Sequence, residues 1–201
     1  YYGVSGRERP NRDKRRMSQQ TLVDDLKQQI ACGQVVVVAG TGVSVATCEN
    51  QQVDGFPVAT WTGLLKQGVH FCQHTENALN AKEAKSVLGQ ISVGETDFLI
   101  SAAELITARL RGKRPGAFRS WLKDSVGKLA PTKPEIIQTL ASWPVTLATL
   151  NYDGLIEAVT HRQPITWQHD DQNEHAFRND GNNAVIHLHG YYDEPDSVIL
   201  G

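Results

Sequence analysis

The sequence is poor in cysteine. Cys32, Cys48 and Cys72 are the only three among 201 residues, and no two of them form a Cys-x-x-Cys pair. An odd number of isolated cysteines is typical neither of a disulfide framework nor of a zinc site. We therefore expect reduced thiols, a cytoplasmic location and no bound metal.

Long hydrophobic runs are also absent. The sequence has no stretch of about 18 apolar residues and no hydrophobic core of a signal peptide, so we expect no membrane association. The 20 basic and 22 acidic residues give a formal net charge of -2. This balance leaves no extended basic surface, so we expect no nucleic-acid partner for the body of the chain.

Positive charge is concentrated near the start of the chain. Residues 1–17 hold six arginines and lysines and few apolar residues, which predicts a flexible basic arm over residues 1–20. This arm fits either a solvated tail or a contact for nucleic acid or a partner. The whole chain is 40% hydrophobic and 21% charged, which is ordinary for a globular protein. We expect residues 21–201 to form one domain.

The segment 34–44, with the sequence QVVVVAGTGVS, organises the rest of the chain. Its four valines predict a short buried strand, and a Gly-Thr-Gly turn follows. Without a Cβ atom, Gly40 and Gly42 let backbone N–H groups approach a pyrophosphate, and Thr41 and Ser44 add hydroxyl groups. The same pattern also fits a purely structural turn of an α/β protein.

Hydrophobic periodicity predicts the other elements. The apolar residues of segment 21–32 lie on one face of a helix that leads into the central strand. Further helices are expected over 61–71, 78–88, 97–110, 118–126 and 134–142, and further strands over 145–149, 165–168, 184–188 and 198–200. This order predicts an α/β fold, in which a Rossmann-like parallel sheet has helices on both faces and an inserted helical layer.

Polar residues stand at the ends of three predicted strands, in the segments 40–44, 149–153 and 187–190. The carboxyl ends of parallel strands border the crevice where α/β proteins bind ligands. Each segment alone also has a structural interpretation, since Asn-x-Asp before a helix can cap it. His187 and His189 should share one sheet face. One of them can therefore be a structural neighbour of the other, with its own hydrogen bonds already satisfied.

Together the three segments resemble the sirtuin superfamily, and the resemblance spans residues 34–201. In that superfamily a glycine-rich turn binds the dinucleotide phosphates, a Thr-x-Asn-x-Asp element lines the nicotinamide-ribose pocket, and a His-Gly pair supplies the catalytic base. Within it the chain resembles the sirtuin-like NAD-hydrolase branch. That branch occurs as effector domains of antiphage defence systems and as stand-alone eukaryotic relatives.

The resemblance implies a role for each matching residue. His189 would be the catalytic base, and Asn151 would orient water or the ribose. The implied NAD-binding residues are Gly40, Thr41, Gly42, Ser44, Thr149, Asn151 and Asp153, and no residue is implied as a metal ligand.

Two features of the superfamily's deacylases are missing. Those enzymes carry two Cys-x-x-Cys pairs after the catalytic histidine, whereas no cysteine follows Cys72 here. Their Pro-Asp-Phe-Arg element is also absent, and Phe56-Pro57 and Trp61 stand in its neighbourhood. Deacylation is therefore disfavoured. The superfamily's C-terminal strands, which bind the adenosine end of NAD, would lie beyond Gly201, so the resemblance implies a sheet that is incomplete at the C-terminus.

We therefore expect an NAD glycohydrolase, which cleaves the nicotinamide–ribose bond of NAD to give nicotinamide and ADP-ribose. NAD would be the substrate, without a metal. As a regulated immune effector it is expected to work as a homo-oligomer or filament, with a sensor or partner domain outside this chain. The alternatives are a non-catalytic module that senses NAD or ADP-ribose and, third, an NAD-dependent deacylase without zinc.

Overall fold

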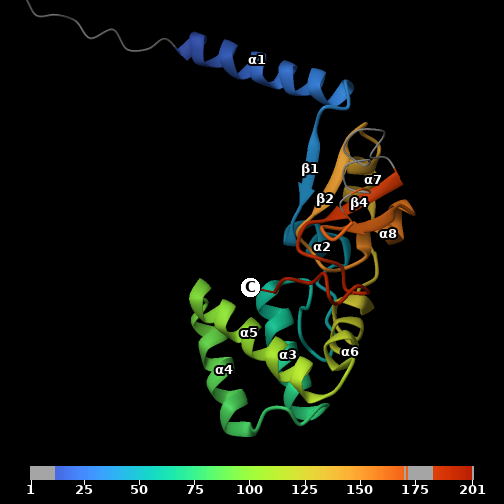
Figure 1. The fold of residues 1–201 in the computed structure, drawn as a ribbon. Coiled ribbons are helices and arrows are strands. Elements are labelled where there is room, and N and C mark those ends of the chain that lie inside the picture. The colour runs from blue at the N-terminus through green and yellow to red at the C-terminus, as the bar shows by residue number, and fades with distance from the viewer. Residues whose placement is uncertain (1–11, 170, 172–182, 201) are drawn as a thin grey trace, which may run out of the picture.

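Four short strands form a fully parallel sheet. The structure is a computed structural model that describes residues 12–169, 171 and 183–200. The strands are β1 (Val36–Ala39), β2 (Thr146–Thr149), β3 (Gln163–Thr166) and β4 (Ala184–His187), and their order in the sheet is β1-β2-β4-β3 (Figure 1). The expected α/β class with a parallel sheet is confirmed.

Three helices cover one face of the sheet, namely α2 (Thr41–Thr47), α7 (Glu135–Ala141) and α8 (Leu155–Thr160). Their apolar side chains, such as Ile137 and Leu155, share a buried cluster with Leu147 of β2. On the opposite face Val36 and Val38 of β1 are 45% and 51% exposed. At β1, therefore, the sheet is covered on one face rather than on the expected two.

The first helix, α1 (Arg12–Ala31), extends away from the sheet (Figure 1). It begins nine residues before the predicted start of the helix at residue 21, so residues 12–20 of the expected arm are helical, and residues 1–11 lie outside the described residues. Its Leu22 and Leu26 are 68% and 53% exposed. The apolar side chains that the sequence places on this helix are therefore exposed, and no described element covers them.

Between β1 and β2 the chain builds a separate layer of helices. They are α3 (Trp61–His74), α4 (Ala81–Val93), α5 (Thr96–Lys113) and α6 (Ala117–Asp124), followed by a short 3-10 helix, η1 (Val126–Lys128). The sequence sets two of their starts, because the side chains of Thr60 and Asn80 accept backbone N–H groups of the first turns of α3 and α4. This layer is the inserted helical layer that periodicity predicted.

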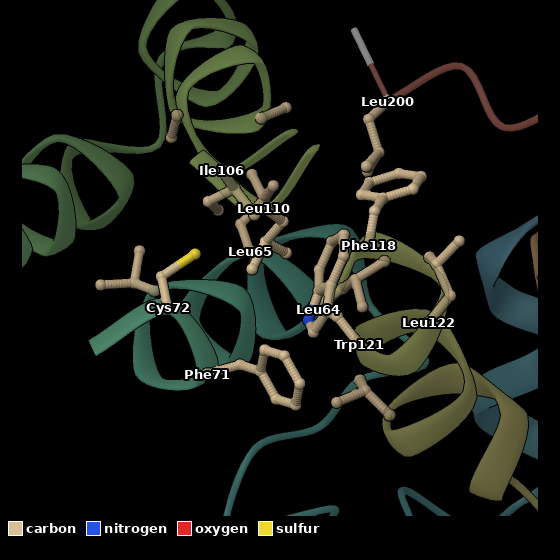
Figure 2. Packing of buried hydrophobic residues seen from close by; sticks show 14 of the residues in the cluster. Leu64, Leu65, Phe71, Cys72, Ile106, Leu110, Phe118, Trp121, Leu122 and Leu200 are labelled. Atoms are coloured by element: carbon tan, nitrogen blue, oxygen red, sulfur yellow. The ribbon is translucent and has the colours of Figure 1, made fainter. Parts of the chain in front are cut away.

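The helical layer has its own core around Trp121 (Figure 2). The indole is fully buried and donates from Nε1 to Gln67 Oε1 at 2.7 Å, which satisfies the one polar atom of the ring. Leu200, from the end of the chain, packs into the same cluster beside Phe118 (Figure 2). The C-terminal residues thus connect the sheet to the helical layer.

Two local predictions were wrong. The Gly-Thr-Gly segment is not a free turn, because α2 begins at Thr41 and Gly42 lies in its first turn. Residues 198–200 form no strand; Val198 and Leu200 instead join the core of the helical layer. Among the described helices none is both long and apolar enough to span a bilayer.

Candidate active site

The carboxyl ends of β1, β2 and β4 meet at one edge of the sheet. Hydrogen bonds join them side by side, from Leu150 N to Ala39 O at 3.0 Å and from Leu188 N to Thr149 O at 2.9 Å. The three polar segments that follow these strands are therefore neighbours in space, as the parallel arrangement predicts.

A chain of side-chain hydrogen bonds links the first two segments. Asn151 donates from Nδ2 to Ser44 Oγ at 2.7 Å, and Ser44 donates from Oγ to Asp153 Oδ2 at 2.6 Å. The other carboxylate oxygen of Asp153 accepts the backbone N–H of Leu155 at the start of α8. Because Ser44 gives its single proton to the carboxylate, it must accept from Asn151, and this fixes the orientation of the Asn151 amide.

Asp153 is a buried carboxyl, 5% exposed. Burial raises its pKa above the ordinary value, while the hydrogen bonds from Ser44 and from the Leu155 backbone pull it down. Asp153 and Ser44 therefore satisfy each other beneath the surface of the site. Thr149, also buried, donates to Ala39 O and accepts the backbone N–H of Asn151.

The two histidines of the third segment have different surroundings. His187 is fully buried, and both of its ring nitrogens have partners, the Asn151 carbonyl at 3.1 Å and Glu157 at 2.8 Å. His189 lies beyond the end of β4 and is exposed, and its ring makes no hydrogen bond to a described residue. The hydrogen bonds of His187 are thus satisfied within the protein, whereas the ring of His189 is exposed at the cavity.

Residues 190–200, which we call the C-terminal strap, hold His189 in place. Ile199 donates its backbone N–H to the His189 carbonyl at 2.9 Å, and Tyr152 donates its hydroxyl to Ile199 O at 2.8 Å. Trp167 in turn donates from Nε1 to Ser197 O at 2.7 Å. The strap therefore joins the ends of β2, β3 and β4.

A cavity of about 460 Å³ lies between the sheet edge and the helical layer. Its polar side is formed by residues of the three segments, Gly40, Thr41, Asn151, Asp153 and His189. Its apolar side comes from the helical layer and the strap, through Trp61, Leu64, Ile100, Val126, Ile199 and Leu200. A few polar groups that converge on a largely apolar cavity are the usual form of a small-molecule site.

The structure brings the predicted site residues together, but only some of them line the cavity. Five of them line the cavity, whereas Gly42, Ser44 and Thr149 do not. Ser44 and Thr149 act instead through hydrogen bonds that orient Asn151. No group of three or more histidine, cysteine, aspartate or glutamate side chains within the described ranges is arranged to hold a metal ion.

Sequence reasoning missed the apolar side of the cavity. Leu64 and Ile100 stand at periodic positions of their helices, and such a pattern is the same for a core residue and for a cavity wall. It also missed Glu157, which reads as an ordinary residue of a short helix. The only signal in the sequence was the position of Glu157 in the first turn of the helix that follows Asp153.

Gly190→Ala tests the packing of the strap. Gly190 has φ +94°, and a Cβ atom there would lie 2.3 Å from Ser197 O. We expect a loss of about 2–4 kcal/mol in the free energy of unfolding, because both the backbone and the strap must shift. Urea unfolding followed by circular dichroism measures it.

The matched control is Gly89→Ala in α4, where an added Cβ meets no atom within 4 Å. Removing a helical glycine in open space should raise stability by about 0.5–1 kcal/mol. Equal urea midpoints for Gly190→Ala and the wild-type protein would contradict the described packing of the strap.

Comparison with known proteins identifies part of the chain. Residues 145–201 match the model of a family described as SIR2-like domain. The match contains β2, β3 and β4 together with Asn151, Asp153 and His189, while the glycine segment after β1 lies outside it. No solved structure matches the chain significantly. Residues 145–201 are therefore similar to a SIR2-like domain, and an NAD-related function fits such a domain in general.

Proposed function

We propose that the protein is an NAD glycohydrolase, which hydrolyses the bond between nicotinamide and ribose C1′. The observation that supports this most is that Asn151 and His189, from two strand ends of the SIR2-like segment, line one cavity with Gly40 and Thr41. The apolar side of that cavity suits an uncharged aromatic leaving group, and the polar side suits a ribose and a water molecule.

In the proposed reaction, water attacks C1′ while the bond from C1′ to the nicotinamide nitrogen breaks. The electron pair of that bond goes to the ring nitrogen, which neutralises the pyridinium, and the proton of the water goes to His189. Nicotinamide leaves without needing a proton, so the protein mainly orients the substrate and the water. His189 suits the base because its ring is exposed at the cavity and has no partner among the described residues.

Asn151 would orient the water or a ribose hydroxyl. One N–H of its Nδ2 donates to Ser44, and its Oδ1 accepts no hydrogen bond from the described part of the chain. A carbonyl oxygen with a fixed direction at the cavity wall is an acceptor for a hydroxyl proton. In this proposal Ser44 and Asp153 act on the substrate through Asn151.

His189→Ala should lower the rate of nicotinamide release from NAD about 10²- to 10⁴-fold, the usual cost of losing a general base. Asn151→Ala should lower the maximal rate as well, because orientation contributes to the rate itself. Free nicotinamide, measured with and without an acylated peptide, is the readout. His74→Ala, an exposed histidine that does not line the cavity, is the control.

Wild-type turnover by folded His189→Ala protein would contradict the assignment of the base. Release of nicotinamide only in the presence of the peptide would identify a deacylase. NAD binding without any release would identify a sensing module. The three functions therefore give three different results when nicotinamide release and NAD binding are both measured.

Gly42→Val tests the predicted phosphate contact. Gly42 lies in the first turn of α2, and a Cβ atom there would meet no protein atom within 4 Å. The variant should therefore fold, while its branched side chain would occupy the space proposed for the pyrophosphate. We expect NAD affinity, measured by calorimetry, to fall at least about tenfold.

Gly89→Val is the matched control, since Gly89 is also helical and surrounded by open space but lies in α4. It should bind NAD like the wild-type protein. An unchanged dissociation constant for Gly42→Val would place the phosphates elsewhere and leave the glycine segment a structural role.

We also propose that the protein works as a homo-oligomer in a defence role. The support is the set of exposed apolar side chains on α1, with Leu22 and Leu26, together with the exposed Val36 and Val38 on one face of β1. Larger apolar patches on a protein surface usually mark an interaction site. Specific activity should then rise with protein concentration, because assembly stabilises the competent state by mass action.

Leu22→Glu combined with Leu26→Glu should abolish this rise and give a monomer in sedimentation. Ile136→Glu, at an exposed apolar position of α7, is the control and should behave like the wild-type protein. A concentration-independent rate from a sedimenting wild-type monomer would contradict the assembly proposal without affecting the catalytic one.

A further inference from the structure

A buried acid–histidine pair lies directly behind the cavity. Glu157 of α8 and His187 of β4 meet through Oε1 and Nε2 at 2.8 Å. The His187 side chain is fully buried, and that of Glu157 is 11% exposed. Neither residue lines the cavity.

The partners of His187 determine where its protons are. The carbonyl of Asn151 can only accept, so Nδ1 must carry a proton and donate it at 3.1 Å. The contact of Nε2 with Glu157 then contains one proton as well, on the ring or on the carboxyl. In either form the histidine is clamped between Glu157 and the backbone of Asn151.

The backbone of Asn151 is therefore held from both sides. Its N–H donates to Thr149 Oγ1 at 3.0 Å, and its carbonyl accepts from His187. Its side chain is held separately, by Ser44. Thr149 and His187 come from neighbouring strands that pair at these same two positions.

The ring of His187 cannot easily move. The ring of Tyr191 lies against it, with centroids 4.7 Å apart. Glu157 holds its far side from α8, and the second carboxylate oxygen of Glu157 is buried without a partner among the described residues. A buried oxygen without a partner costs stability. Filling space in the core therefore does not by itself account for a glutamate at position 157.

We propose that Glu157 and His187 are positioning residues that fix the Asn151 backbone, and through it the direction of the Asn151 side chain, for the reaction in the cavity. The inference rests on the proposed hydrolysis of NAD, since it assigns these residues to the same site. Neither residue touches the substrate. Their contribution is the geometry of Asn151, and a shift of about 1 Å in such a group can cost about 100-fold in rate.

The test is a set of Glu157 variants assayed for nicotinamide release. Glu157→Ala removes the partner of Nε2 and should lower kcat about 10- to 100-fold, with KM within about threefold of the wild-type value. Glu157→Gln should restore kcat to within about threefold, because its amide N–H can donate to the Nε2 lone pair of a neutral ring.

Glu76→Ala is the matched control. Glu76 is also a buried carboxylate with one ionic partner, Arg114, but it belongs to the helical layer and does not line the cavity. Its loss should lower stability and leave kcat unchanged. An equal fall of kcat in Glu76→Ala and Glu157→Ala would overturn the positioning role, and so would wild-type kcat in Glu157→Ala or no rescue by Glu157→Gln.

A second measurement does not depend on catalysis. In nuclear magnetic resonance spectra of labelled protein, the Asn151 backbone and side-chain amide signals should shift in Glu157→Ala and stay in place in Glu76→Ala. If the wild-type protein releases no nicotinamide, the proposed function has failed, and these signals alone decide the positioning role. Unchanged Asn151 signals in Glu157→Ala would overturn it in either case.

Discussion

The hydrogen bond from Ser44 to Asp153 connects two parts of the chain that are 109 residues apart in sequence. It joins α2, the first helix after β1, to the loop before α8. The ends of the neighbouring strands β1 and β2 are therefore held at a fixed distance from each other. The oxygen of Ser44 then has room only to accept, and the amide of Asn151 must donate to it. The orientation of the Asn151 amide at the cavity is thus set by the buried hydroxyl of Ser44.

The polar groups beneath the cavity depend on one another. Asp153 is buried, and a buried carboxylate is tolerated when hydrogen bonds compensate for the lost water. Thr149 and His187 hold the Asn151 backbone, and Glu157 holds His187. The apolar side of the cavity comes from another layer and meets this network through the C-terminal strap. The cavity therefore forms only where the sheet edge and the helical layer are in contact.

The sequence predicted the helices and strands better than it predicted which of their side chains are covered by other elements. The run of valines indicated β1, and the periodic residues of α3 to α6 indicated the helical layer, because burial of one helix face imposes such a spacing. Periodicity could not tell that Leu22 would remain exposed, since it marks an apolar face without naming what covers it. The same limit applies to Val198, which reads as part of a strand and instead fills the core of the helical layer.

Of the site, residue types at strand ends predicted which segments converge, because the ends of parallel strands share an edge. They could not predict which hydroxyl or imidazole would face the cavity. Ser44 and His187 turn inward, whereas His189, just past the end of β4, stays exposed. His187 is held inside by Asn151 and Glu157, whereas His189 has a backbone contact with the strap that joins residues ten apart in the sequence.

The strap also sets the moment at which the site first exists during synthesis of the protein. The cavity wall includes Ile199 and Leu200, while its opposite side is made near residue 40. A ribosome releases the chain from the N-terminus at about 5–20 residues per second, so β1, the helical layer and β2 emerge well before the strap. A nascent chain would therefore leave the polar residues after β1 and β2 open to water until Leu200 has left the exit tunnel. Any chemistry in the cavity must wait until the strap has emerged and packed against the helical layer.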